Sequence, residues 1–424
     1  MPNNLFKFVF QSRGASNLLK RSFQIVSRFG VRADRMGRRF AQFMDLLDTH
    51  NCRPTFPITA LPMSRNPQFA RRLLERGAEL AVHACTHVDL TALDLQGQMD
   101  NLGKAIDIFR EEGMPFTGFR APYLHWNEDT MSVVDTYKFC YSSNQTVLWN
   151  VVDMEGLTSE QLTGWNKAKS FYRPVDADDV FVLPRRTKSF IELPVSLPDD
   201  ETLIDRMYFK NPDILGEVWS AIFAQTHARG ELFTIQLHPE RVSFFSQPLS
   251  DLLTRCRGEK RGVWLASLAE IAEWWTLKVQ NEAKFIREDG VYKVVVKACK
   301  GAVVYLRNNG GERRVDPGVI KIESRRRPCV GVNPGSDRNA IEILTDKGYI
   351  LEVGEKPDAF AVHLGTIENC QYRTVAHLLD QLDKFEGPLL RFGVWPHGNR
   401  SALAVTGDID SLTIWDFVHR LRGA

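Results

Sequence analysis

Two histidines spaced four residues apart, His83 and His87, follow directly on an apolar run. Residues 78–82 have the length and side chains of a buried strand, which predicts that both imidazoles lie on one side of the loop or helical turn that follows. Imidazole nitrogens at this spacing can share one divalent metal ion. Two histidines four apart are more often incidental, so the pair alone gives only a candidate metal site.

Three clusters of polar residues share one layout, a short apolar run that ends in side chains able to do chemistry. The histidine pair is the first, Arg120 with Pro122 and Tyr123 is the second, and His238 is the third. Predicted helices separate the runs, as in residues 66–77, where Asn-Pro opens and Gly closes the segment. In parallel α/β folds the carboxyl ends of the strands carry the active site, so the layout predicts one site in an α/β fold.

With the clusters in this order, residues 22–278 resemble the NodB-type polysaccharide deacetylase family (carbohydrate esterase family 4). The resemblance implies a distorted (β/α)7 barrel. It also implies a divalent metal ion, with Zn²⁺ as the expected metal, held by His83, His87 and a carboxylate. In the family mechanism, Arg120 keeps a catalytic base ionised and His238 protonates the departing amine.

One feature of the family is missing from its usual place. The first barrel strand of the family ends in two acidic residues, a general base and a metal ligand. Here the predicted strand 23–27 is followed by Arg28 and Phe29. An apolar run near the other end of the chain closes instead in Asp408 and Asp410, similar to a first-motif strand with spaced acids.

Our hypothesis is that the run 401–407 lies beside strand 23–27, completes the barrel and supplies Asp408 as the base and Asp410 as the third metal ligand. A neighbouring subunit could donate this strand instead. The alternative is an Asp-rich loop after an ordinary strand. The distance from the Asp410 carboxylate to the two imidazoles decides between these interpretations, because ligands of one ion lie about 3 to 4 Å apart.

Four further residues are assigned to substrate binding. Pro122 and Tyr123 are expected to wall the pocket, although Tyr123 is equally plausible as a core residue. Asp199 and Asp200 follow the predicted strand 190–196, and either acid could orient His238; the sequence does not choose between them. Residues from about 145 to 188, upstream of these acids, form an irregular stretch, which we interpret as a lid or a substrate-facing insertion because it is too long for a simple loop.

A chain of 424 residues exceeds the usual size of a single core. We predict four parts: an N-terminal extension (1–21), the deacetylase-like barrel (22–278), a small β-rich accessory domain (279–365) and a C-terminal segment with a helix and the Asp-x-Asp strand (366–424).

The composition of the chain limits the kinds of partner and the location that we expect for the protein. The 54 basic and 52 acidic residues nearly cancel, which argues against a nucleic-acid partner. No apolar run approaches the length of a membrane span. Seven scattered cysteines without a Cys-x-x-Cys pair, and no recognisable secretion signal, favour a cytoplasmic location. We expect a carbohydrate or glycoconjugate substrate, and a homo-oligomer is an open possibility.

The resemblance implies a metal-dependent hydrolase of C–N amide bonds, an N-deacetylase of an acetamido sugar. Given the expected location, a lipid-linked or nucleotide-linked sugar precursor suits better than a cell-wall polymer. Two alternatives stay open: a catalytically inactive carbohydrate-binding or scaffold protein, which Arg28 and Phe29 favour, and an amidohydrolase of a small non-sugar compound.

Overall fold

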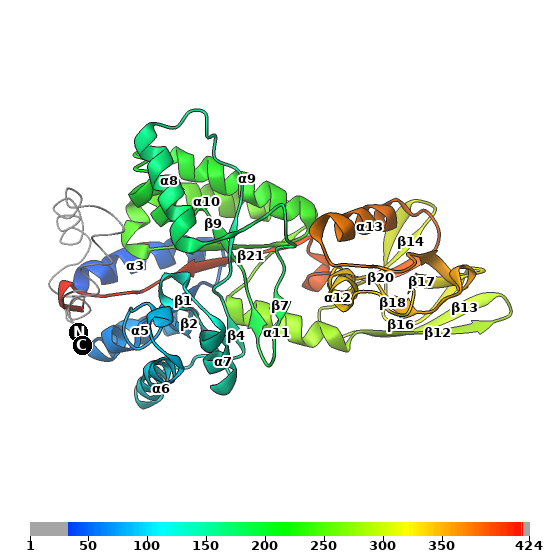
Figure 1. The fold of residues 1–424 in the computed structure, drawn as a ribbon, viewed down its shortest axis with the longest axis horizontal. Helices are drawn as coiled ribbons and strands as arrows, with labels where there is room; N and C mark the ends of the chain where they lie inside the picture. The colour runs from blue at the N-terminus through cyan, green and yellow to red at the C-terminus, as the bar shows by residue number, and fades with distance from the viewer. Residues whose placement is uncertain (1–32, 417, 419–424) are drawn as a thin grey trace.

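The computed structural model describes residues 33–416 and residue 418. The predicted extension 1–21 and the predicted strand 23–27 lie outside the described residues. Figure 1 shows an elongated molecule, with a larger α/β unit around strand β21 (Ser401–Gly407) and a smaller unit at the amino end of that strand.

A large curled sheet organises the larger unit. Its strand order is β6-β5-β9-β10-β21-β1-β2-β3-β4-β8-β7, with β11 also paired to β21, and every pair except β7–β8 is parallel. This topology confirms the predicted α/β class and the distorted barrel. The strands are β1 (Thr55–Ile58), β2 (Glu79–Val82), β3 (Gly118–Phe119), β4 (Tyr141–Ser142), β5 (Thr146–Leu148), β6 (Val175–Asp176), β7 (Arg185–Arg186), β8 (Ile191–Glu192), β9 (Val195–Leu197), β10 (Leu232–Leu237) and β11 (Val263–Leu265).

Helices surround this sheet, and local sequence explains where they start and stop. Pro67 opens α5, and Gly77 follows its end with φ +81°, a conformation that favours glycine. Ser267 and Glu270 form a capping box at the start of α11. The helices are α3 (Asp34–Thr49), α4 (Ala60–Arg65), α5 (Pro67–Glu75), α6 (Leu95–Glu111), α7 (Glu128–Thr136), α8 (Ser159–Tyr172), α9 (Asp213–Arg229), α10 (Val242–Gly258) and α11 (Leu268–Leu277).

Strand β21 occupies the centre of the sheet although it comes late in the chain. All seven of its residues are buried, as expected for an apolar strand covered on both faces. Six residues of β21 pair in register with β10, from Ala402 to Gly407, and Thr406 pairs with Thr55 of β1. The carboxyl ends of β21, β10 and β2 therefore share one edge of the sheet, and each strand delivers a predicted site residue there.

Two segments differ from the sequence-based expectation. The stretch interpreted as irregular contains α8, whose capping box of Thr158 and Gln161 was overlooked. Residues 190–196, predicted as one strand, form β8 and β9, which lie far apart in the sheet: β8 pairs with β4, and β9 lies between β5 and β10. Pro194 separates the two, since a proline cannot donate a hydrogen bond to a neighbouring strand.

The smaller unit contains three sheets of three strands. Two are antiparallel, β12-β13-β16 and β15-β14-β20, and β18-β17-β19 is parallel. Its elements are β12 (Glu282–Glu288), β13 (Val291–Lys297), β14 (Val304–Asn308), β15 (Gly311–Val315), β16 (Gly318–Glu323), β17 (Arg327–Val332), α12 (Arg338–Asp346), β18 (Leu351–Val353), β19 (Phe360–His363), α13 (Tyr372–Lys384) and β20 (Leu389–Phe392). Since β20 pairs with β14, the first part of the predicted C-terminal segment (366–424) belongs to this unit. The predicted domain boundaries stay predictions.

Buried ionic contacts join the two units. Lys347, at the end of α12, donates to Glu231 at 3.2 Å and to the Arg229 carbonyl at 2.9 Å. Asp346 accepts from Arg186 at 2.7 Å, and its carbonyl accepts from Lys278 at 2.8 Å. Glu231 precedes β10, so the smaller unit packs against the amino ends of the strands, opposite the edge that carries the site residues.

In the part of the chain that the structure describes, no helix combines the length and the apolar character needed to cross a membrane.

Candidate active site

The three predicted metal ligands meet at the carboxyl edge of the sheet. His83 follows β2, His87 lies in the next loop, and Asp410 follows β21. Oδ1 of Asp410 lies 3.1 Å from Nε2 of His87 and 3.5 Å from Nε2 of His83. These are the separations that ligands of one ion require, and a single chain provides all three groups.

The tautomer of His83 makes this cluster suitable for a cation. Nδ1 of His83 lies 2.8 Å from the Arg120 carbonyl oxygen, which can only accept, so Nδ1 carries the proton. Nε2 is thus the ring nitrogen that faces the Asp410 carboxylate. A divalent cation between Nε2 of His83 and Oδ1 of Asp410 would be ligated by both groups.

The charge of Asp410 agrees with this geometry. Burial alone would raise the pKa of its carboxyl group, but His87 and His83 hold that pKa well below its usual value. Asp410 is therefore ionised at neutral pH, as a metal ligand must be. The role of the three residues as metal ligands stays a proposal.

Asp408 is held by both of its oxygens. Arg120, which is fully buried, donates to Oδ1 of Asp408 at 2.8 Å, and Gln236 of β10 donates to Oδ2 at 2.8 Å. Arg120 is itself fixed by the hydroxyl and the carbonyl of Ser143, at 2.8 and 3.1 Å, and by Thr406 at 2.7 Å. A carboxylate that accepts from two fixed donors is held in one orientation, which suits a general base.

The carboxylate of Asp200 holds the His238 ring through one of its nitrogens. Nδ1 of His238 lies 2.7 Å from Oδ1 of Asp200, whose Oδ2 accepts from the backbone N–H of His238 and from Arg241. Burial disfavours the imidazolium, but the charge of Asp200 raises the pKa of His238 well above its ordinary value. His238 is therefore protonated at neutral pH and can act as an acid.

The structure separates the roles of the two neighbouring acids. Asp200 alone hydrogen-bonds to His238, whereas Asp199 accepts from the backbone N–H of Thr202 at 2.8 Å and from the Tyr172 hydroxyl at 3.4 Å. Burial and the nearby charge of Asp200 raise the pKa of Asp199 to about 6. Burial alone would raise the pKa of Asp200 too, but His238 and Arg241 lower it to about 2.

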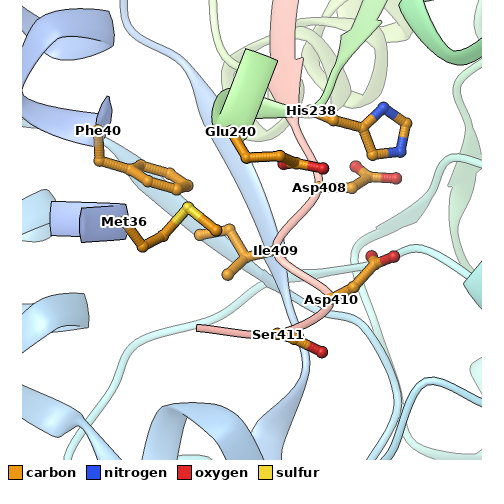
Figure 2. A pocket seen from close by; sticks show the side chains of 8 residues that line it. All are labelled: Met36, Phe40, His238, Glu240, Asp408, Ile409, Asp410 and Ser411. Atoms are coloured by element: carbon orange, nitrogen blue, oxygen red, sulfur yellow. The ribbon is translucent and has the colours of Figure 1, made fainter. Parts of the chain in front are cut away.

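A small pocket separates the predicted acid and base residues from helix α3. Figure 2 shows His238, Asp408 and Asp410 along one side of it and Met36 and Phe40 of α3 on the opposite side. Its remaining lining residues are Glu240, Ile409 and Ser411. Polar groups that converge on a partly apolar cavity are typical of a ligand site.

Pro122 and Tyr123, the predicted pocket wall, lie beside the proposed metal ligands His83, His87 and Asp410, which we call the metal cluster. Pro122 is buried, and the ring of Tyr123 packs edge-on against the His87 ring, with 4.5 Å between ring centroids. Phe171 of α8 packs against Tyr123 at 5.9 Å. The α8 segment, part of the predicted insertion, therefore borders the site. Substrate binding by these residues stays a proposal.

Sequence reasoning missed two residues of the site. Gln236 was overlooked because an amide in the middle of an apolar strand resembles a residue on the outer face of a sheet. Arg241 follows the His-Pro of the third cluster, where a basic residue gives no specific signal. The available signal for Gln236 was its position two residues before His238, because side chains two apart in a strand point to the same face.

The family comparison agrees with this geometry. Residues 34–141 match the family model described as polysaccharide deacetylase. The matched region contains His83, His87 and Arg120, whereas His238 and both aspartates of the C-terminal strand lie outside it.

Two curated relatives match over part of their length. A peptidoglycan deacetylase-like protein of Gibberella zeae is 32% identical over 117 residues, 27% of this chain and 34% of the relative. A chitooligosaccharide deacetylase of Sinorhizobium fredii is 31% identical over 94 residues, 22% of this chain and 43% of the relative. The chain thus spans less than half the length of either relative.

Solved structures resemble the chain more weakly. A structure described as a polysaccharide deacetylase from Pseudomonas aeruginosa has a TM-score of 0.43 at 17% identity and covers 56% of this chain and 72% of its own. A carbohydrate esterase family 4 pseudoenzyme from Bacillus anthracis has a TM-score of 0.30 at 12% identity, with coverages of 56% and 61%.

Proposed function

The chain carries a polysaccharide deacetylase domain of the NodB type, carbohydrate esterase family 4, and on that premise we propose that it is a metal-dependent hydrolase of C–N amide bonds. The substrate we propose is an acetamido sugar in a polysaccharide or glycoconjugate, from which the enzyme removes the acetyl group. One observation carries the proposal: β21 places Asp408 and Asp410 beside the Arg120 guanidinium and the two imidazoles.

The surroundings of each side chain in the site suit it to one step of amide hydrolysis. His83, His87 and Asp410 would hold the ion, Zn²⁺ in our expectation, which supplies Lewis-acid polarisation of the acetyl carbonyl and a more acidic water. Asp408, fixed by Arg120 and Gln236, accepts the proton of the attacking water. His238 gives its proton to the leaving nitrogen, since Asp200 keeps the imidazole protonated.

The structure removes one reason for the inactive alternative. Arg28 and Phe29 favoured a scaffold because they stand where acidic residues are expected, but β21 provides two carboxylates at the metal cluster. The small non-sugar amide stays an alternative substrate, and the cytoplasmic location and the lipid-linked or nucleotide-linked precursor stay predictions.

Metal analysis and an activity assay test the proposal together. We expect the purified full chain to hold about one Zn²⁺ and to release acetate from N-acetylglucosamine oligomers, and both properties to disappear in Asp410→Ala. Asp408→Asn should keep the metal and lose about 10² to 10⁴-fold in kcat, because only the base is removed.

The outcomes distinguish the proposed deacetylase from the inactive scaffold and from a hydrolase of another amide. Metal content that is indifferent to Asp410→Ala would support the scaffold. Metal binding without acetate release from any acetamido sugar would support another amide substrate. Arg65→Ala serves as a control, since Arg65 forms its ion pair with Asp416, beyond the metal cluster.

A further inference from the structure

The turn that places Tyr123 beside the metal cluster is held in a strained conformation. Tyr123 and Leu124 both have positive φ, +63° and +58°, in a region that residues with a Cβ rarely adopt. Such conformations persist where the surrounding structure over-determines them, and they concentrate at functional sites. Since the ring of Tyr123 contacts that of His87, the strained turn sets the position of a group at the site.

The next residue, His125, joins this turn to two other elements. Nδ1 of His125 lies 2.8 Å from Oδ2 of Asp89, in the loop that follows His87. Nε2 of His125 lies 2.8 Å from the carbonyl oxygen of Phe171, in the last turn of α8. The His125 ring also packs on the Phe171 ring, with 4.6 Å between centroids.

Each ring nitrogen of His125 therefore has its own oxygen partner, and the two partners belong to two different elements. A side chain with a single polar atom could not contact both. The half-buried ring thus bridges the His87 loop and the end of α8.

We propose that His125 is a positioning residue of the amide-hydrolysing site: it clamps the His87 loop to the end of α8 and thereby holds Tyr123 in its strained turn. This inference rests on the proposed function. His125 acts through Tyr123, which contacts His87, and through α8, which borders the site.

Kinetics of three His125 variants test the clamp. In His125→Ala and His125→Gln we expect kcat for acetate release to fall about 10- to 100-fold, with KM changed less than about threefold, because a displaced turn costs catalysis more than substrate capture. Zn²⁺ content should stay at the wild-type level. His125→Arg should recover at least about tenfold over His125→Ala, since a guanidinium can donate to a carboxylate and a carbonyl together.

The matched control is His363→Ala, in the smaller unit. His363 is also half-buried and bonded to a backbone carbonyl, that of Gly354 at 2.7 Å, but it lies far from the site in the fold. The proposal is overturned if kcat of His125→Ala stays within about twofold of wild type, if His363→Ala falls equally, if Arg gives no recovery, or if His125→Ala loses Zn²⁺.

Hydrogen exchange separates failure of the clamp from failure of the proposed function. If the wild-type chain releases no acetate from acetamido sugars, the function fails, and exchange still tests the clamp. Amides of residues 123–126 and 165–173 should then exchange at least about tenfold faster in His125→Ala than in wild type or in His363→Ala. Equal exchange in the three proteins overturns the inference.

Discussion

At the scale of single residues, the site depends on carboxylates whose surroundings set their charge. Asp199 and Asp200 are neighbours in sequence and both are buried, yet the pKa of Asp199 is raised to about 6 and that of Asp200 is lowered to about 2. The difference follows from their partners, because only Asp200 faces the cations His238 and Arg241. Asp200 is thus the permanently charged partner that keeps His238 protonated.

Removing the charge of Asp200 should change the pH dependence of catalysis. In Asp200→Asn the pKa of His238 falls, since the largest influence that raises it is gone. The acid form is present below that pKa, so the alkaline limb of the kcat/KM profile should move to lower pH. Above the new midpoint, activity should drop about tenfold per pH unit.

The pH profile of His238→Gln provides the check. This variant should lose the alkaline limb together with most of its activity. If the limb remains at the wild-type midpoint in either variant, it belongs to another group and the assignment of His238 as the acid is wrong.

Residue types and spacing singled out His83, His87, Arg120 and His238, because each cluster follows an apolar run, and the resemblance to the family added Asp408 and Asp410. The same reasoning could not choose between Asp199 and Asp200. Which of two adjacent carboxylates faces His238 depends on the course of the backbone after β9, and this course is set by packing rather than by local sequence.

At the scale of elements, β21 must fit closely between β1 and β10. A Cβ added to Gly407, the last residue of the strand, would lie 2.8 Å from the Phe56 ring and 2.9 Å from the Pro239 ring. Neither ring is the end of a flexible chain. The glycine therefore lets the strand end deep enough for the aspartates that follow it to reach the metal cluster.

Gly407→Ala should consequently displace both aspartates. We expect a loss of about 1 to 3 kcal/mol in the free energy of unfolding from overpacking, and a Zn²⁺ affinity at least about tenfold lower. Calorimetric melting and metal titration measure the two effects. Gly37→Ala is the control, because its added Cβ meets nothing within 4 Å in α3 and should leave Zn²⁺ binding unchanged. Wild-type Zn²⁺ affinity in Gly407→Ala would contradict this account of β21.

Hydrophobic pattern predicted β21 as a strand, and the acids after it predicted its destination. The hypothesis placed it beside strand 23–27, which lies outside the described residues. Its pairing with β1 and β10 was not predicted, since strand order in a sheet depends on contacts between residues far apart in sequence. The splitting of residues 190–196 into β8 and β9 has the same origin: a continuous apolar run does not reveal that Pro194 directs its two halves to different neighbours.

At the scale of the whole molecule, the smaller unit rests on the amino ends of the barrel strands through buried cations. Lys278 donates to the Asp346 carbonyl and lies 3.8 Å from the centre of the Trp275 ring. Burial lowers its pKa to about 7, although Asp346 opposes this shift. The length of the chain predicted more than one domain, but not that the second would dock opposite the site.

This lysine should make stability depend on pH. Between about pH 7 and pH 10 the unfolded chain keeps a proton on Lys278 that the folded chain has released, so the free energy of unfolding rises with pH, by up to about 1.4 kcal/mol per unit. In Lys278→Met this rise should be absent. The difference between wild type and variant in urea unfolding across this range measures it.

Lys284→Met is the matched control, because Lys284 is exposed on β12 and should leave the pH dependence at the wild-type slope. If the wild-type and Lys278→Met curves stay parallel from pH 7 to pH 10, Lys278 is not the group that responds.

The late position of β21 in the chain has a consequence for biosynthesis. Arg120 leaves the ribosome 288 residues before its partner Asp408. At translation rates of about 5 to 20 residues per second, roughly 15 to 60 s pass between the two. During that interval β1 and β10 lack the strand that pairs with both of them in the finished fold, so we expect a chaperone that covers their apolar edges to raise the yield of folded chain.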